Sequence, residues 1–472
     1  MELYNTLTKQ KEELKPIKGK LIKFYHCGPT VYWTQHIGNL RAMTMGDLIR
    51  RSLMYMGFEV NYVRNYTDVG HLTSDADEGE DKMEKGAKRE GLSPEEIADK
   101  YIQIFENDIK KINLLEPTHK SKATAKISEI IQMIQVLLEK QAAYITPKAI
   151  YFDVTKAQDY PAFSNKKLED QRTGAGKGEI VDSNKRHPAD FVLWFFKTGV
   201  HKNALQFWPS PFKSENVANG EGFPGWHIEC SVIAESFLGK TLDIHMGGVE
   251  HIPIHHPNEI AQSETANEQK FANYWLHNEH LLVNDRKMSK SEGTGFSLQE
   301  IQDRGFDPMD LRYFFLTAHY RSKQNFTWSA LEAAKNARIK LINQLRTITG
   351  KGQVNPKLKD QFLMTIKDDV NIPNALAIVW EVLKSNIPEA DKKATILDFD
   401  QVLGLKLKES LLEKEAKLSE AEKTQVKELL AQREAARKTG DFAQSDQIRD
   451  TLKEKYNVEI EDTPEGTKWR II

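Results

Sequence analysis

A strand–helix–strand segment near the N-terminus is the feature that most constrains how this chain can fold. Residues 21–27 are mostly apolar and are followed by Gly and Pro, which is typical of a buried strand. Apolar residues recur at helical spacing over 45–56, and a second strand-like run covers 58–63. This order is a βαβ unit, which predicts an α/β fold with a parallel sheet covered by helices. Ligands of such sheets bind at the carboxyl ends of the strands, where Cys27 lies.

The next part of the chain contains a charged segment and a predicted insertion. Residues 72–96 are rich in charge and glycine, so we expect an exposed loop that leads into a helix. Their acidic stretch resembles the start of a calcium loop, but its glycine comes one position early and no glutamate follows at the required spacing. A helical pattern over 127–138, a turn-rich region over 161–188 and an apolar run over 191–196 follow. We expect these three to form an insertion between two halves of the sheet domain.

The C-terminal third is predicted to be helical and to end in a small β-hairpin. The pattern after Ser291 is helical to about Tyr456. Residues 458–471 alternate in polarity around a Thr-Pro-Glu-Gly turn, which is typical of a hairpin. Because a single core stops growing near about 250–300 residues, a chain of 472 residues is expected to hold about three domains.

Composition and charge exclude several classes of protein. A hydrophobic content of 39% with a net charge of −2 is too apolar and too neutral for a disordered chain. The near balance of charge also means that any nucleic-acid binding must use local patches or shape. No apolar run has the length of a membrane span, and residues 1–5 lack the layout of a signal peptide. We therefore expect a cytoplasmic protein with no membrane partner.

The segment 36–39 (His-Ile-Gly-Asn) is a candidate nucleotide site. It follows the first strand and opens the helix, and a helix N-terminus presents unpaired N–H groups and a positive dipole end that suit a triphosphate. Gly38 would let a nucleotide approach the backbone, while His36 and Asn39 are candidate donors to phosphate or ribose. A histidine near a helix start is, by itself, more often structural.

The segment 287–291 (Lys-Met-Ser-Lys-Ser) is a second candidate. Chance occurrence of this pentapeptide is on the order of 10⁻⁴ in a chain of this composition. If this segment is a loop, Lys287 and Lys290 can move to stabilise the negative charge that develops on an α-phosphate in the transition state. The alternative is a solvated basic loop.

The only two cysteines, Cys27 and Cys230, belong to a candidate metal site. Downstream, His255 and Glu259 are four residues apart, so on a helix they face the same way. Two thiolates, an imidazole and a carboxylate suit Zn²⁺ better than Mg²⁺ or Ca²⁺. Nearby histidines are candidates for an outer layer or for contact with substrate: His245, His251 and His256.

Taken together, these segments resemble the class I cysteinyl-tRNA synthetases over nearly the whole chain. The segments that carry the resemblance are 3–7, 27–32, 36–39, 63–68, 190–194, 225–230, 255–263, 287–291, 432–437, 441–442 and 467–470.

The resemblance implies a Rossmann-like catalytic domain with an insertion, then a helical bundle and a small mixed α+β domain that binds the anticodon. The implied ranges are 1–117 and 207–292 for the catalytic halves, 118–206 for the connective insertion, 293–407 for the stem-contact helices, and 408–472 for the anticodon domain.

The resemblance also assigns roles to residues. The implied zinc ligands, one ion per chain, are Cys27, Cys230, His255 and Glu259. The implied nucleotide-binding and catalytic residues are His36, Gly38, Asn39, Lys287 and Lys290. Thr67 and Trp226 match positions that line the cysteine pocket.

This chain departs from the family pattern at three places. Asn39 replaces a histidine, Pro257 replaces a glutamate, and the loop 208–224 is longer and lacks the usual Trp-Gly-x-Gly-Arg-Pro. An asparagine still donates a hydrogen bond, so we expect activity to survive.

The implied reaction joins L-cysteine to tRNA(Cys) through cysteinyl-adenylate, using ATP with Mg²⁺. We expect a monomer, since nothing in the sequence requires a dimer. Two alternatives are a cysteine ligase of the mycothiol pathway, which acts on an amino sugar, and a non-catalytic zinc-stabilised RNA-binding protein. The tail around 433–470 argues against the first, and the intact 287–291 loop argues against the second.

Overall fold

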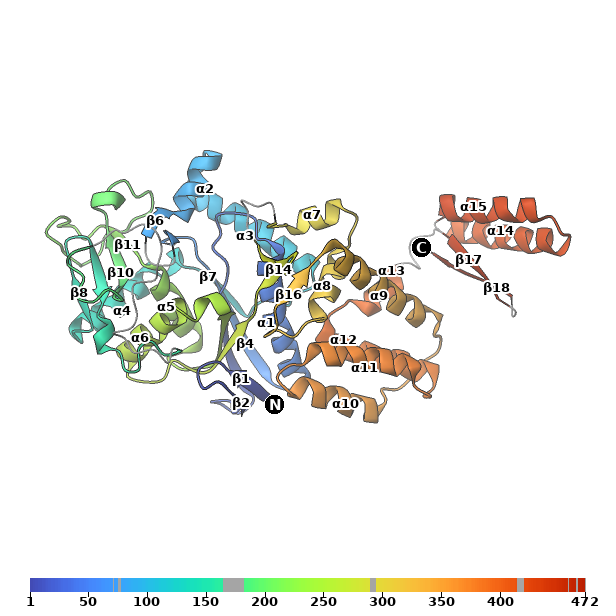
Figure 1. The fold of residues 1–472 in the computed structure, drawn as a ribbon, viewed down its shortest axis with the longest axis horizontal. Helices are drawn as coiled ribbons and strands as arrows, with labels where there is room; N and C mark the ends of the chain where they lie inside the picture. The colour runs from blue at the N-terminus through green and yellow to red at the C-terminus, as the bar shows by residue number, and fades with distance from the viewer. Residues whose placement is uncertain are drawn as a thin grey trace. The chain divides into compact units, whose positions relative to one another are not determined.

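A computed structural model describes residues 1–70, 72–74, 78–163, 182–288, 294–413, 420–456, 458–463 and 466–471. The chain forms two units, one of residues 1–338 and 351–405 and the other of 339–350 and 406–472 (Figure 1). Within the described residues, no helix combines the length and the apolar character needed to cross a membrane.

The first unit is built on a five-stranded parallel sheet, which confirms the predicted α/β fold. Its order is β13 (Ala272–Asn278), β12 (Leu242–Gly248), β3 (Leu21–His26), β4 (Glu59–Tyr66) and β7 (His119–Lys122). Every neighbouring pair is parallel. After β3 the chain adds β4 and β7 on one side of the sheet, and after β12 it adds β13 on the other side. The strand order therefore reverses between β3 and β12, and ligands of such sheets bind at this switch point.

Helices connect these strands as a βαβ fold requires. Helix α1 (Ile37–Tyr55) joins β3 to β4, α5 (Trp226–Leu238) precedes β12, and α6 (His255–Asn267) joins β12 to β13. Because helices α1, α5 and α6 all lie next to β3 or β12, their ends come together at the switch point.

The segment between β4 and β7 corrects the loop expected over 72–96. It contains β5 (Leu72–Ser74), β6 (Glu78–Asp81), α2 (Lys82–Glu90) and the start of α3 (Pro94–Lys111). The Asp81 carboxylate accepts from the N–H groups of Met83 and Glu84, and Gly91 ends α2 in the left-handed conformation with φ 68°. Caps therefore fix this helix, although its apolar stripe is too short to show in the sequence pattern.

The insertion is an antiparallel sheet in the order β11-β10-β9-β8, with α4 (Ile127–Glu139) beside it. Its strands are β8 (Ala143–Ile145), β9 (Ala149–Phe152), β10 (Phe191–Phe196) and β11 (Gly222–Pro224). The sheet does not coincide with the predicted range 118–206, because β7 pairs with β4 in the parallel sheet and β11 lies further along the chain. Most of the turn-rich stretch, residues 164–181, lies outside the described residues.

The rest of the first unit is mainly helical, as expected, with one small sheet. That sheet has the order β15 (Arg286–Lys287), β14 (Leu281–Val283) and β16 (Gln324–Phe326). The helices are α7 (Leu298–Asp303), α8 (Pro308–Leu316), α10 (Pro356–Lys367), α11 (Ile372–Lys384) and α12 (Glu389–Leu403), together with α9 (Trp328–Thr347) as far as residue 338, since its remainder belongs to the second unit. A hairpin of β1 (Glu2–Asn5) and β2 (Gln10–Glu13) completes the unit. Figure 1 shows α10–α12 and the insertion at opposite ends of it.

A buried ionic group fixes these helices to α1. The Asp47 carboxylate on α1 accepts from Arg51 and from Arg312 of α8, both at 2.8 Å. Arg312 also donates to the Leu403 carbonyl at the end of α12. Removing one member of such a group leaves a buried charge unpaired and costs about 3–5 kcal/mol.

The second unit contains α13 (Leu407–Glu413), α14 (Glu420–Lys438), α15 (Phe442–Tyr456), β17 (Val458–Thr463) and β18 (Gly466–Ile471). The last two strands pair antiparallel, which confirms the predicted hairpin. A small apolar core, with Val426, Leu452 and Val458 at its centre, joins the helices to the hairpin.

Candidate active site

A pocket of about 210 Å³ lies at the carboxyl ends of β3 and β12, the place predicted from the topology. The Cys27 N–H, just beyond β3, donates to the Met246 carbonyl of β12 at 3.0 Å and so joins the two strand ends. The lining residues include Cys27, Asn39, Thr67, Trp226, Cys230, Glu250, His251 and His255. Seven of these eight, all but Glu250, were candidates from the sequence, although they span more than two hundred positions of it.

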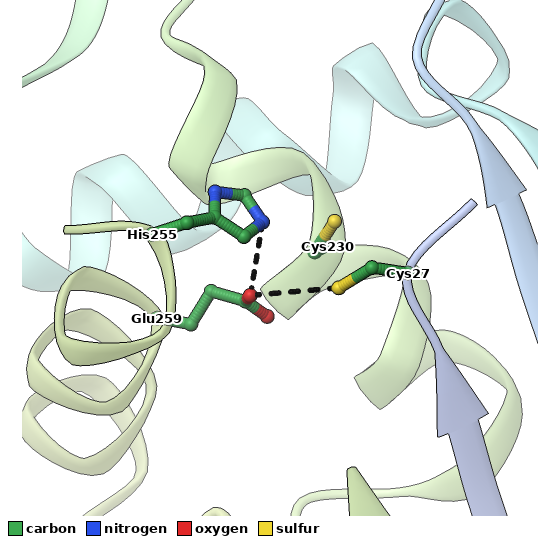
Figure 2. A group of neighbouring side chains, drawn as sticks. All are labelled: Cys27, Cys230, His255 and Glu259. Carbon is green, nitrogen blue, oxygen red and sulfur yellow. Dashed lines mark hydrogen bonds and ion pairs between the residues drawn. The ribbon is translucent and has the colours of Figure 1, made fainter. Parts of the chain in front are cut away.

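The four predicted metal ligands come together at the inner end of this pocket (Figure 2). Cys27 follows β3, Cys230 lies on α5, and His255 and Glu259 lie one turn apart on α6. Their ligand atoms all lie within 4.8 Å of one another, and all four side chains are buried. His255 Nε2 is 3.0 Å from Glu259 Oε1, which is 4.0 Å from Cys27 Sγ.

Electrostatics at this group favour a cation. Burial opposes ionisation of Glu259, but the charges of His245 and His255 outweigh it and lower its pKa to about 2. Burial likewise opposes protonation of His255, but Glu259 and Cys230 raise its pKa to about 10. A hydrogen bond from Cys27 lowers the pKa of Cys230 to about 6, whereas burial and the Cys230 thiolate raise the pKa of Cys27. Three groups that can carry negative charge therefore crowd a buried space, which a divalent cation would neutralise.

A second group of four overlaps the first. Cys27, His245, His256 and Glu259 also bring their ligand atoms within 4.8 Å of one another. His245 Nε2 is 2.8 Å from Glu259 Oε2, and Cys27 Sγ is 3.5 Å from His256 Nε2. Of its histidines, neither borders the pocket, whereas Cys230 and His255 of the first group do.

A further layer of histidines holds these side chains in place; the sequence analysis named His256 as a candidate for it but not His227 or His277. The ring nitrogens of His227 and His255 are 2.9 Å apart, and those of His256 and His277 are 2.7 Å apart. His277 in turn contacts the Thr6 hydroxyl at 2.9 Å. Such hydrogen bonds set the orientation and tautomer of a ligand histidine. No spacing rule could have found His277, because its contacts depend on the parallel pairing of β13 with β12.

The predicted nucleotide segment opens α1. His36 is the N-cap residue, and its Nδ1 accepts from the Asn39 N–H at 3.2 Å. Asn39 borders the pocket. At Gly38 a Cβ atom would lie 2.7 Å from Met288 Cε and 3.0 Å from His36 Cε1, so a side chain at this position would have to displace the end of the Met288 side chain.

The described residues on either side of the predicted lysine segment are bonded to the same end of α1. Lys287 ends β15 and is exposed, and Lys290 lies outside the described residues. Beyond that gap, the Ile37 N–H donates to the Phe296 carbonyl at 2.8 Å. Before it, buried Arg41 donates to the Gln324 side chain of β16 and to the Glu279 carbonyl ahead of β14. One turn of helix therefore anchors the chain on both sides of the lysine segment.

The two predicted cysteine-pocket residues both border the cavity. Thr67 follows β4, and its backbone exchanges hydrogen bonds of 3.1 Å with Pro29 and Val31. The Trp226 ring stacks on the His255 ring, with centroids 4.2 Å apart and an interplanar angle of 24°. This indole therefore covers one candidate ligand and faces the pocket at the same time.

Comparison with known proteins decides the family. Residues 13–336 match the family described as the catalytic domain of the class I (C) tRNA synthetases. The chain is 43% identical over 474 residues to Cysteine–tRNA ligase 1 of Burkholderia lata, covering 99% of this chain and 96% of the relative. It is 38% identical over 499 residues to the Cysteine–tRNA ligase of Treponema denticola, covering 100% and 99%. This chain belongs to the class I cysteinyl-tRNA synthetases.

A solved structure supports the fold of this synthetase. Methionyl-tRNA synthetase of Mycobacterium tuberculosis, in complex with methionyl-adenylate, aligns with a TM-score of 0.54 at 12% identity over 83% of this chain and 92% of that one. The curated relatives match the synthetase over its full length, C-terminal unit included. This extent favours the family over the mycothiol-pathway and non-catalytic alternatives.

The structure accommodates Pro257, which stands where the family pattern has a glutamate. This residue is the third of α6, where backbone N–H groups have no partner within the helix. The longer loop 208–224 closes on itself, since Trp208 and Gly222 exchange two backbone hydrogen bonds. Glu250, which borders the pocket, was not predicted as a site residue.

Proposed function

We propose that this protein activates L-cysteine with Mg-ATP and transfers the cysteinyl group to the terminal ribose of tRNA(Cys). The observation that supports this most is the shared pocket, in which the metal-ligand candidates Cys27, Cys230 and His255 face the same space as Asn39 and Thr67. A group of soft metal ligands suits a substrate with a thiol, and a helix N-terminus beside it suits the triphosphate with which the carboxylate of that substrate reacts.

The donor set fits one zinc ion bound by Cys27, Cys230, His255 and Glu259. Tetrahedral zinc with bonds of about 2.0–2.3 Å keeps its ligand atoms roughly 3–4 Å apart, close to the observed spacing. We choose this group over the one with His245 and His256 because it contains both cysteines and borders the pocket. When bound, the ion would offer a soft Lewis acid that favours a thiolate over a hydroxyl.

The other pocket residues hold the reacting groups. Thr67 and Trp226 would position the amino acid, with the indole excluding water from the candidate ligands. At the other side, the positive dipole end of α1, the side-chain amide of Asn39 and His36 would bind phosphate or ribose. Gly38 would allow the nucleotide to approach the helix backbone.

Adenylate formation then needs no covalent nucleophile from the protein. The carboxylate of the substrate attacks the α-phosphate and pyrophosphate leaves, so the chain contributes positioning and charge. Lys287 and Lys290 would stabilise the negative charge that develops on the phosphate oxygens.

The C-terminal unit would read the anticodon. Trp469 on β18 is 40% exposed, and unpaired RNA bases stack on such rings. Residues 401–472 are not basic overall, so recognition there would use specific contacts. A cytoplasmic location and a monomeric state remain predictions.

Cysteine-dependent ATP–pyrophosphate exchange, followed by charging of bulk tRNA, tests this function. We expect exchange with cysteine but not with methionine, and radiolabel from cysteine in acid-precipitable tRNA. A variant with Lys287 and Lys290 both changed to Ala should bind cysteine but lose exchange. Exchange with cysteine but no tRNA charging would instead indicate a small-amine acceptor, and no exchange at all would contradict an adenylating enzyme.

A further inference from the structure

Trp33 is an exposed indole close to the active site. It lies in the segment between β3 and α1, three residues before the N-cap His36, and is 37% exposed. An exposed indole offers an aromatic face on which the ring of a ligand can stack. Pro29 and Thr30 of the same segment border the pocket, but Trp33 does not. A ligand on this ring would therefore lie outside the cavity, next to its lining.

One face of the indole is backed by a fixed guanidinium. Arg89 of α2 lies over the Trp33 ring, with Cζ 3.7 Å from the centroid. Arg89 Nη2 also donates to the Tyr32 carbonyl at 3.0 Å, to the Glu90 carboxylate at 2.7 Å and to the Tyr101 hydroxyl at 3.2 Å. These bonds hold the cation in place whether or not anything contacts the indole.

The backbone that carries Trp33 is also held rigidly. The Gln35 side chain donates to the carbonyls of Thr30 and Trp33, at 3.0 and 3.1 Å. Helix α2 packs so closely on this segment that a Cβ at Gly86 would lie 3.2 Å from the Tyr32 carbonyl oxygen. A preorganised ring loses little conformational entropy when it is stacked upon.

Helix α2 brings positive charge to the same place. Lys85, Lys88 and Arg89 are exposed and lie three and four residues apart, so they share one face of the helix. A cationic helix face next to a rigid aromatic ring is the combination that binds single-stranded nucleic acid, with cations on the phosphates and the ring on a base.

We propose that Trp33, backed by Arg89, is a stacking platform for an unpaired base at the 3′ end of the tRNA, with Lys85 and Lys88 on adjacent phosphates. This inference rests on the proposed function, which requires that single strand to enter the pocket from outside. It adds a specific contact between the catalytic domain and the RNA, separate from anticodon reading.

Aminoacylation kinetics on the full-length enzyme test the platform. Trp33→Ala should lower kcat/KM for tRNA about tenfold or more, as loss of one base stack predicts. Trp33→Phe, which keeps a ring, should recover most of that loss. Cysteine-dependent pyrophosphate exchange uses no tRNA, so its kcat and its KM for ATP should stay within about twofold. This exchange also shows, independently, whether the proposed function holds.

Salt dependence tests the cationic face. The double variant Lys85→Ala with Lys88→Ala should flatten the fall of kcat/KM for tRNA with rising salt, because fewer counterions are displaced on binding. An increased KM for ATP in Trp33→Ala would place the adenine of ATP on the ring and overturn the proposal. So would an equal loss of exchange and charging, which indicates a structural role, or tRNA kinetics that stay unchanged.

Discussion

The Met288 side chain lies directly against Gly38: a Cβ added at Gly38 would come within 2.7 Å of Met288 Cε. The two residues belong to the two segments that the sequence singled out for phosphate chemistry. Their contact means that a side chain at residue 38 would shift the Met288 side chain, which belongs to the lysine segment.

Gly38→Ala is therefore expected to impair catalysis without unfolding the protein. The added methyl displaces Met288 or His36, and a displacement of about 1 Å in a catalytic segment can lower the rate about 100-fold. Alanine is a better helix former than glycine by up to about 1 kcal/mol, so the melting temperature should not fall. Pyrophosphate exchange and thermal melting on the same samples measure both effects.

A second variant identifies the cause. Adding Met288→Ala to Gly38→Ala removes the contact and should restore part of the exchange rate. If the double variant recovers nothing, the methyl acts instead by keeping the nucleotide from the helix backbone. If Gly38→Ala has wild-type activity, close packing at this position has no role in the reaction.

Sequence patterns predicted the elements of this fold better than its side-chain contacts. The βαβ unit was predicted because apolar spacing and glycine and proline breaks are local signals. The grouping of Cys27 with His255 was predicted from the donor chemistry of the side chains, whereas the structure alone shows that both follow strands flanking the switch point. Helix α2 was missed because its caps, rather than an apolar face, define it. The bonds from Arg41 to Gln324 could not be predicted, because no local pattern records which residues 283 positions apart will meet.

The buried Asp47 group predicts how stability depends on pH. Burial opposes ionisation of Asp47, but Arg51 and Arg312 outweigh it and hold its pKa below the ordinary value of 3.8. The ionised form therefore stabilises the fold at pH values above about 3.8, and this contribution is lost as the pH falls through the lowered pKa. Asp47→Asn should reduce the free energy of unfolding by about 3–5 kcal/mol at pH 7.

Urea denaturation at pH 7 and near pH 3 measures that dependence. The difference between wild type and Asp47→Asn should shrink at the lower pH, because the wild-type carboxylate is then becoming protonated. Asp446→Asn is a matched control, since it removes an exposed carboxylate 2.8 Å from Arg449 and should change stability by less than about 1 kcal/mol. If wild type and Asp47→Asn differ in stability by the same amount at both pH values, the charge of Asp47 is not what stabilises the contact between α1 and α8.

Selection against serine should occur during binding. Serine is nearly isosteric with cysteine, so pocket shape alone separates the two only weakly. A soft metal centre prefers a thiolate to a hydroxyl by several kcal/mol, which corresponds to a factor of about 10³ or more in kcat/KM. The ratio of kcat/KM for the two amino acids in pyrophosphate exchange measures this preference. Activation of serine within tenfold of cysteine, followed by hydrolysis of the mischarged tRNA, would contradict it.

The central claim is that Cys27, Cys230, His255 and Glu259 bind one zinc ion that receives the substrate thiol. Zinc content per chain, measured together with cysteine-dependent pyrophosphate exchange before chelation, after it and after zinc is returned, tests this most directly. We expect about one zinc per chain, loss of exchange on removal and recovery on return, with His255→Ala unable to retain the metal and His256→Ala still able to bind it. A metal-free protein that is folded and fully active with cysteine would contradict the account.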